Sequence, residues 1–162
     1  MTESDPDLAS VFKQAMRRVA STVNVITICV GGEPKGITAT AMSALALDPP
    51  SLLVCINRSA ALHDMMEDVS HFRINVLHRD QEDIAQMFAD RSQLALRFLG
   101  GWEVDCDRPP RLSEAQAAIL CRLTDHHRFG THSIFIGVVE EVTVREEIRP
   151  LLYLDGAYRS AV

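Results

Sequence analysis

Small and hydroxyl-bearing side chains are concentrated between Thr38 and Ala44, and this segment is the part of the sequence best suited to hold a ligand. Thr38, Thr40 and Ser43 each carry a hydroxyl that can hydrogen bond to the polar edge of a bound molecule. The small side chains between them would let the backbone approach a flat ring closely. The segment therefore suggests a planar ligand.

A second polar group follows the next apolar run. Asn57, Arg58 and Ser59 come directly after residues 52–56, at the start of a helix that we predict over about 59–67. A helix start offers unpaired N–H groups to an anion, and Arg58 adds positive charge. Asn57 and Ser59 are equally suitable as helix caps, and small residues equally suit a tightly packed strand. Residue types alone leave a phosphate-bearing planar ligand and a purely structural segment both open.

The elements that would position these residues are mostly short strands. Apolar spacing predicts a helix over 7–20 and a second near 81–88 that Asp80 caps. We expect strands at 22–30, 36–46, 52–56 (buried on both faces), 72–76, 117–124, 134–144 and 151–154, a loop at 100–111, a bulge at Gly137 and a turn at Asp155-Gly156. Many strands and few helices favour a mainly β fold with flanking helices, in which a barrel is closed or nearly closed. The length of 162 residues fits one domain, 1–162.

Composition argues against several classes of partner. The net charge of −6 does not suit a nucleic-acid surface, which needs basic residues to neutralise phosphates. No run reaches the roughly 18 apolar residues of a membrane span, and the acidic, polar N-terminus does not resemble a signal peptide. We therefore expect a cytoplasmic protein with no nucleic-acid or membrane partner.

Other catalytic chemistries lack their motifs. The sequence contains no G-x-G-x-x-G, no Walker loop and no G-x-S-x-G. His126, His127 and His132 do not have the spacing of a zinc site, so we expect no metal. The four cysteines (Cys29, Cys55, Cys106 and Cys121) are dispersed, and we expect them to be reduced and structural.

The sequence resembles the flavin reductase-like family, in particular its short-chain NAD(P)H:flavin oxidoreductases. The resemblance covers nearly the whole chain and is strongest in residues 36–64; it continues through 12–27, 72–77, 81–89, 130–142 and 150–159. It implies a split β-barrel of the FMN-binding type that works as a homodimer. It also implies hydride transfer from NADH or NADPH to FAD or FMN, and delivery of reduced flavin to a separate monooxygenase.

The resemblance also implies roles for individual residues. Thr38, Ala39, Thr40 and Ser43 would line the isoalloxazine and ribityl part of the flavin, and Asn57, Ser59 and Ala60 would bind the ribityl chain and phosphate. Phe88 and Arg91 would lie near the far end of the flavin, and His132 and Tyr158 would contact the nicotinamide nucleotide. Thr131 departs from the family's frequent Gly-Asp-His, which leaves the choice between NADH and NADPH open. No acid, base or nucleophile is expected, because the flavin carries the chemistry.

Other functions remain open at this point. The chain could reduce another acceptor through flavin, such as a corrinoid or a metal chelate. It could also be a non-catalytic flavin- or haem-binding module, or a plain interaction domain. The residues do not distinguish FAD from FMN, or tight from transient flavin binding, and they do not identify the partner oxygenase.

Overall fold

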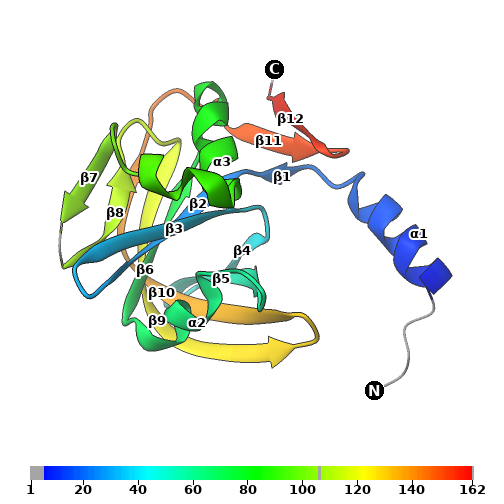
Figure 1. The fold of residues 1–162 in the computed structure, drawn as a ribbon, viewed down its shortest axis with the longest axis horizontal. Coiled ribbons are helices and arrows are strands. Elements are labelled where there is room, and N and C mark those ends of the chain that lie inside the picture. Colours follow the sequence, from blue (N-terminus) through cyan, green and yellow to red (C-terminus); the bar gives the residue numbers. More distant parts are fainter. Residues whose placement is uncertain (1–5, 106, 162) are drawn as a thin grey trace.

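A computed structural model describes residues 6–105 and 107–161, which form mainly antiparallel strands (Figure 1). The elements are α1 (Pro6–Met16), β1 (Ser21–Thr22), β2 (Asn24–Val30), β3 (Glu33–Ala39), β4 (Met42–Leu47), β5 (Pro50–Asn57), α2 (His63–Asp68), β6 (His71–Val76), the 3-10 turn η1 (Arg79–Gln81), α3 (Glu82–Ala89), the 3-10 turn η2 (Arg91–Leu96), β7 (Trp102–Asp105), β8 (Arg108–Leu112), β9 (Ala117–Phe129), β10 (His132–Val144), β11 (Leu151–Leu154) and β12 (Ala157–Ser160). The predicted mainly β fold with flanking helices is confirmed. Cys106 lies outside the described residues.

One sheet of seven strands organises the molecule, in the order β3-β2-β6-β9-β10-β5-β4. Its two edges, β3 and β4, are consecutive in the chain and are joined only by Thr40 and Ala41. Three steps between Cα atoms span at most about 11 Å, so the sheet must curl until its edges nearly meet. The edges are not hydrogen bonded to each other, and the result is the split barrel that the resemblance implied.

This join corrects the predicted strand over 36–46, which is in fact two strands. The chain bends at Thr40 and Ala41, where the Met42 N–H donates to the Thr40 carbonyl at 3.0 Å and the Cys55 N–H donates to the Ala41 carbonyl at 3.0 Å. No glycine or proline marks the break. The residues at Thr40 and Ala41 therefore do not predict that the chain leaves one edge of the sheet and continues at the other.

β2 is buried on both faces and separates two apolar clusters. Ile26 and Ile28 pack inside the barrel, in the cluster that also contains Phe72 and Phe135. Val23 and Val25, which alternate with them, pack on the other face with α3 and β8. β2, which pairs with the edge strand β3, thus separates the interior of the barrel from the cluster under α3.

Two glycines, one in β10 and one in β3, allow close packing against phenylalanine rings. A Cβ atom at Gly137 would lie 2.7 Å from the Phe72 ring, and the register shifts between Ile136 and Gly137, which confirms the predicted bulge. A Cβ atom at Gly36 in β3 would lie 2.8 Å from Cε1 of Phe88 in α3. Phe88 therefore supports β3 from outside the barrel.

The helices begin and end at other residues than predicted. α1 ends at Met16, and α2 begins at His63 rather than at 59. His78, not Asp80, caps the turn that leads into α3. The His78 ring accepts from the Asp80 N–H, and the Gln81 side chain accepts from the His78 N–H. Sequence rules favour aspartate at this position, and here histidine and glutamine form the capping pair instead.

One predicted loop contains two strands, and the predicted strands 117–124 and 134–144 were too short. The predicted loop 100–111 contains the hairpin of β7 and β8, in which Pro109 and Pro110 are buried. β9 continues to Phe129 and β10 starts at His132, so the polar residues 124–132 form a long exposed hairpin. The hairpin 124–132 shows no apolar alternation because it extends beyond the core, whereas β8 contributes Leu112 to the core.

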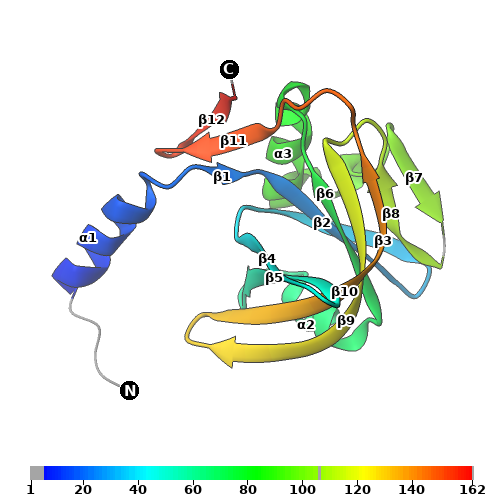
Figure 2. The same cartoon turned by 180° about the vertical axis from the view of Figure 1, so that it is seen from behind.

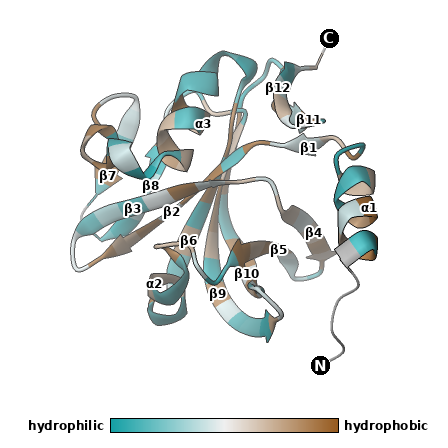
Figure 3. Cartoon of the chain, turned by 45° about the vertical axis from the view of Figure 1, so that its right-hand side comes forward, coloured by the Kyte–Doolittle hydropathy of each residue, from teal (hydrophilic) through white to brown (hydrophobic). Residues whose placement is uncertain are grey.

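α1 stands away from the sheets, as the two opposite views show (Figures 1 and 2). Its apolar side carries Leu8, Val11 and Phe12, all exposed, and Figure 3 shows the brown apolar patches on this helix. Arg17 ties the end of the helix to the body through the Asp155 carboxylate, at 3.0 Å. In the part of the chain that the structure describes, no helix has the length and apolar character needed to cross a membrane.

Candidate functional site

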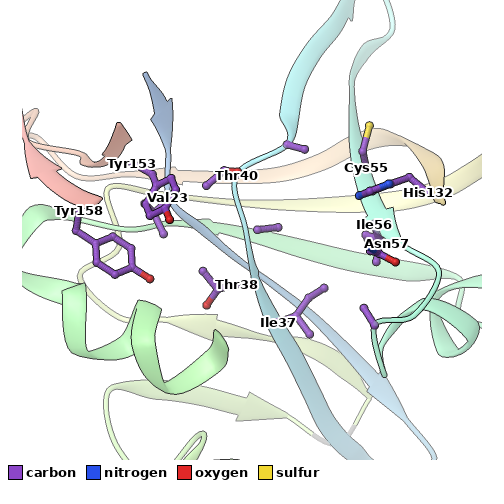
Figure 4. A pocket seen from close by; sticks show the side chains of 13 residues that line it. Val23, Ile37, Thr38, Thr40, Cys55, Ile56, Asn57, His132, Tyr153 and Tyr158 are labelled. Carbon is purple, nitrogen blue, oxygen red and sulfur yellow. The ribbon is translucent and has the colours of Figure 1, made fainter. Parts of the chain in front are cut away.

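A cavity of about 360 Å³ opens where β3 gives way to β4, beside β5 and β10 (Figure 4). This volume lies within the range of roughly 300–1,000 Å³ that is usual for small-molecule sites. The cavity is lined by Val23, Ile37, Thr38, Ala39, Thr40, Ala41, Cys55, Ile56, Asn57, Ala60, His132, Tyr153 and Tyr158. Seven of the eleven predicted site residues are among them. We call this space the β3–β10 cavity.

Thr38 and its small neighbours form the wall that β3 contributes. The Thr38 hydroxyl donates to the Ala85 carbonyl in α3 at 2.7 Å. Its proton is therefore used, and the Thr38 oxygen can only accept a hydrogen bond from a ligand N–H. Ala39 and Thr40 continue this wall with side chains that leave room for a flat ring.

The opposite wall comes from the pairing of β5 with β10. His132 lies directly across from Asn57 in this ladder, and the Arg58 N–H donates to the Thr131 carbonyl at 2.8 Å. The Thr131 hydroxyl lies 2.9 Å from Nδ1 of His132, so Nε2 is the ring nitrogen left for a ligand. The loop after β5 and the tip of the β9–β10 hairpin thus form one connected wall.

The loop from Asn57 to Leu62 is ordered by the Asn57 side chain. Its Oδ1 accepts from both the N–H and the hydroxyl of Ser59, each at 2.9 Å, and the Asn57 carbonyl accepts from the Ala60 N–H. These bonds use N–H groups that a helix start at 59 would have left unpaired, and the helix itself begins later. An anion at this loop would instead meet the guanidinium groups of Arg58 and Arg91, since Arg91 reaches the Ser59 carbonyl at 3.0 Å.

Four predicted site residues do not line the cavity. Ser59 lies in the adjoining loop, and Arg91, the first residue of η2, contacts that loop through the bond just described. Ser43 lies on the exposed edge strand β4, where its hydroxyl donates to the Ala44 carbonyl. Phe88 is 1% exposed and packs against Phe98 and other aromatic residues outside the barrel.

Tyr153 is a lining residue that the sequence reasoning missed. It pairs with Tyr158 across β11 and β12, and the two rings meet edge to face with centroids 5.5 Å apart. The predicted Asp155-Gly156 turn could have shown this, because a two-residue turn places residues 153 and 158 opposite each other. Burial, followed by the neighbouring Tyr153, raises the pKa of Tyr158 above its usual value. Tyr158 therefore remains a neutral hydroxyl in the cavity.

Cys55 is a second lining residue that was not predicted. The prediction placed its strand in a fully buried environment, whereas only Leu52, Val54 and Ile56 are buried and Cys55 faces the cavity. Burial raises the pKa of the Cys55 thiol, so the thiol is protonated at neutral pH. The other missed residues (Val23, Ile37, Ala41 and Ile56) are apolar and carry no sequence signal of their own.

No group of three His, Cys, Asp or Glu side chains among residues 6–105 and 107–161 is arranged to hold a metal ion. The cavity instead offers small side chains, hydroxyls, an imidazole and nearby guanidinium groups. These groups fit a flat ring that carries a phosphate: the ring would lie against Thr38 to Thr40, and the phosphate near Arg58 and Arg91.

The chain is similar to known proteins along nearly its whole length. The family model of the flavin reductase like domain matches residues 16–161. The reductase component of the FADH(2)-dependent resorcinol hydroxylase from Rhizobium sp. (strain MTP-10005) is 39% identical over 153 residues, which are 93% of this chain and 86% of that protein. The reductase component of 4-hydroxyphenylacetate 3-monooxygenase from Thermus thermophilus is 34% identical over 155 residues, which are 96% of this chain and 98% of that protein.

Solved structures show the same fold. The NADH:FAD oxidoreductase SgcE6 of Streptomyces globisporus C-1027, in complex with NAD and FAD fragments, superposes with a TM-score of 0.87. The match covers 98% of this chain and 96% of that one, at 26% sequence identity.

Proposed function

This chain belongs to the flavin reductase-like family, and from that membership we propose that it reduces FAD or FMN with NADH or NADPH in the β3–β10 cavity and supplies reduced flavin to a separate monooxygenase. The observation that carries the proposal is the composition of this cavity. Small and hydroxyl residues of β3, the loop after β5, and the side chains of His132 and Tyr158 surround one space of suitable size.

The protein's part in the reaction is binding and orientation, since a bound flavin supplies the ring that accepts the hydride. In this proposal Thr38, Ala39 and Thr40 contact the ring and ribityl chain. Asn57, Ser59 and Ala60 shape the loop at the phosphate position, and the neighbouring guanidinium groups of Arg58 and Arg91 bind the phosphate charge. Ser43 and Phe88 lie outside the cavity, so the proposal gives them no direct contact with the ring.

The nicotinamide nucleotide is assigned to His132 and Tyr158. Both side chains can form hydrogen bonds, the Tyr158 hydroxyl being neutral, and they approach the cavity from different elements (Figure 4). Hydride transfer needs two rings held at roughly 3–3.5 Å, and it needs no acid or base at the moment of transfer. Walls of small residues with few charges suit that task and also allow the reduced flavin to leave.

A direct assay tests this function. Purified protein is mixed with FAD or FMN and NADH or NADPH, and the absorbance of the reduced nicotinamide is followed. We expect its consumption to depend on both protein and flavin. Absence of flavin-dependent consumption would contradict the proposal, and flavin binding without turnover would favour a non-catalytic module. Faster turnover with a corrinoid or a metal chelate as final acceptor would favour the alternative reductase.

We further propose that residues 1–162 act as one flavin reductase-like domain, in the cytoplasm, and that two copies pair. The support is the apolar side of α1, where Phe12 is 64% exposed, and the edge strand β4, where Leu47 is 90% exposed. A second copy would cover these side chains. Sedimentation should give a dimer, and Phe12→Glu should shift it toward monomer. A monomeric wild type, or a mass that Phe12→Glu leaves unchanged, would contradict this pairing through α1.

A further inference from the structure

His63 is a buried histidine outside the β3–β10 cavity, and the mechanism above does not use it. It is the first residue of α2 and its side chain is 2% exposed. Nε2 lies 2.8 Å from the hydroxyl of Ser133 in β10, and Nδ1 lies 2.8 Å from the carboxylate of Asp64. Both ring nitrogens therefore have a partner, and the ring also packs edge-on against Phe135.

The proton positions in this group follow from its chemistry. The Asp64 carboxylate can only accept, so Nδ1 of a neutral His63 carries the proton and Nε2 accepts from the Ser133 hydroxyl. If the ring is protonated, Nε2 donates to the same oxygen. The bond between His63 and Ser133 is thus available in either protonation state, and it can serve as a permanent tie between α2 and β10.

An acid, a histidine and a serine in this order also occur in hydrolytic enzymes, but here the serine cannot act as a nucleophile. Ser133 is fully buried and does not line the β3–β10 cavity. The exposed member is instead Asp64, with 93% of its side chain accessible. Because Ser133 is buried, we interpret this group as a structural link between α2 and β10 and not as a hydrolytic site.

The tie joins the two segments that form the wall of the cavity. On one side, successive turns lead from Asn57 to His63, because the Ala60 N–H donates to the Asn57 carbonyl and the His63 N–H donates to the Ala60 carbonyl. On the other side, Ser133 directly follows His132 in β10. Movement of His63 would therefore displace both the loop that we assign to the phosphate and the strand that carries His132.

A second contact holds α2 to the same hairpin. Glu67, one turn after His63, accepts three hydrogen bonds from Arg128 in β9, at 2.8, 3.0 and 3.2 Å. The residues i and i+4 of a helix share a face, so both contacts act on the same side of α2. The pair of Glu67 and Arg128 is partly exposed and screened by salt, whereas the bond of His63 is buried. The buried bond should be the one that sets the position of the loop.

We propose that His63 is a positioning residue of the flavin site, which holds the loop 57–62 in place through Ser133. This inference rests on the proposed function. A buried hydrogen bond of this kind is worth about a five- to tenfold change in an equilibrium constant. Loss of the bond should thus weaken flavin binding by that factor and raise the KM for NADH. It should leave kcat at saturating flavin and NADH within about twofold of wild type, because no group that contacts the reacting atoms is removed.

The test compares Ser133→Ala, His63→Leu and His63→Gln with the control Ser70→Ala. The control removes another serine–histidine bond, from Ser70 to His71, which is exposed and not part of the cavity wall. The flavin Kd is measured by fluorescence quenching without NADH, followed by KM, kcat and Tm. We expect a raised Kd for Ser133→Ala and His63→Leu, recovery in His63→Gln through its amide, and no change in Ser70→Ala.

Two results would overturn the proposal. One is a folded Ser133→Ala with a flavin Kd within twofold of wild type, even if its Tm falls, because that describes a merely structural bond. The other is a His63→Gln variant as weak as His63→Leu. If His63→Leu does not fold, Ser133→Ala alone decides. Wild-type protein that binds flavin but does not consume NADH would refute the proposed function and leave the positioning proposal standing.

Discussion

His132 lies directly opposite Asn57 in the antiparallel ladder between β10 and β5. Side chains at such a position are about 5 Å apart at Cβ and point to the same face of the sheet. The residue assigned to the nicotinamide and the residue that shapes the phosphate loop are therefore neighbours, although 75 positions separate them along the chain. In the proposed assignment, the flavin phosphate and the nicotinamide therefore share one wall of the cavity.

His132→Ala should raise the KM for NADH several-fold while the flavin Kd changes little. Its Nε2 is available to a ligand, whereas the loop at Asn57 keeps its own hydrogen bonds without it. The flavin Kd and the KM for NADH are measured separately. A larger change in flavin affinity than in the KM for NADH would mean that His132 contacts the flavin instead.

Ser59→Asp should weaken flavin binding by roughly tenfold, because it places a negative charge beside the phosphate position. The charge would also attract Arg91, which now donates to the Ser59 carbonyl. Ser59→Ala is the control, since it removes the hydroxyl and adds no charge. Equal flavin affinity in Ser59→Asp and wild type would remove this residue from the site.

Bound flavin should protect Cys55 from thiol reagents, because Cys55 lines the β3–β10 cavity. Mass spectrometry after labelling at pH 8, with and without FMN, measures the protection at each cysteine. Cys121 is the internal control: burial raises its pKa to about 12, and it should react slowly in both samples. If FMN does not slow the labelling of Cys55, flavin binds elsewhere.

The convergence of Thr38 to Thr40 with Asn57 could be predicted, because each segment carries a local pattern of small or polar residues. The separation of β3 from β4 could not, since Thr40 and Ala41 have no residue that marks a break. The bond between His63 and Ser133 joins positions 70 residues apart, which come together because β5, the strand before α2, pairs with β10. Both the break between β3 and β4 and the bond between His63 and Ser133 depend on long-range strand pairing, which local residue propensity does not predict.

Gly36→Ala should destabilise the protein by about 1–3 kcal/mol, the usual cost of overpacking. The new Cβ would lie 2.8 Å from the Phe88 ring and 3.1 Å from the Ile26 carbonyl. Denaturant unfolding gives the free energy, and Gly100→Ala, where no heavy atom lies within 4 Å, is the control. Phe88→Leu should restore part of the loss. Equal stability of Gly36→Ala and wild type would show that α3 moves away freely.

Glu141→Gln should lower Tm at pH 7, and the difference from wild type should narrow below about pH 4. The hydrogen bond from buried Arg73 holds the pKa of Glu141 below its usual value, and Arg108 contributes less. The ion pair therefore stabilises the fold above the unfolded pKa of about 4.3, and this contribution is lost as the pH falls through the lowered folded pKa.

Thermal unfolding between pH 3 and pH 7 measures this dependence on Glu141. Glu33→Gln is the control, because it removes an exposed pair with Lys35 and should change Tm little. A Tm difference between Glu141→Gln and wild type that stays constant with pH would show that the carboxylate charge does not contribute.

The two-residue connection of Thr40 and Ala41 has a consequence for how such a barrel can diversify. Its length, rather than the identity of any side chain, limits how far apart the two edges of the seven-stranded sheet can stand. Inserting residues there would loosen this limit while the lining side chains of β5 and β10 stayed unchanged. Loop length at this one point is thus a means of admitting bulkier acceptors without substitution on β5 or β10.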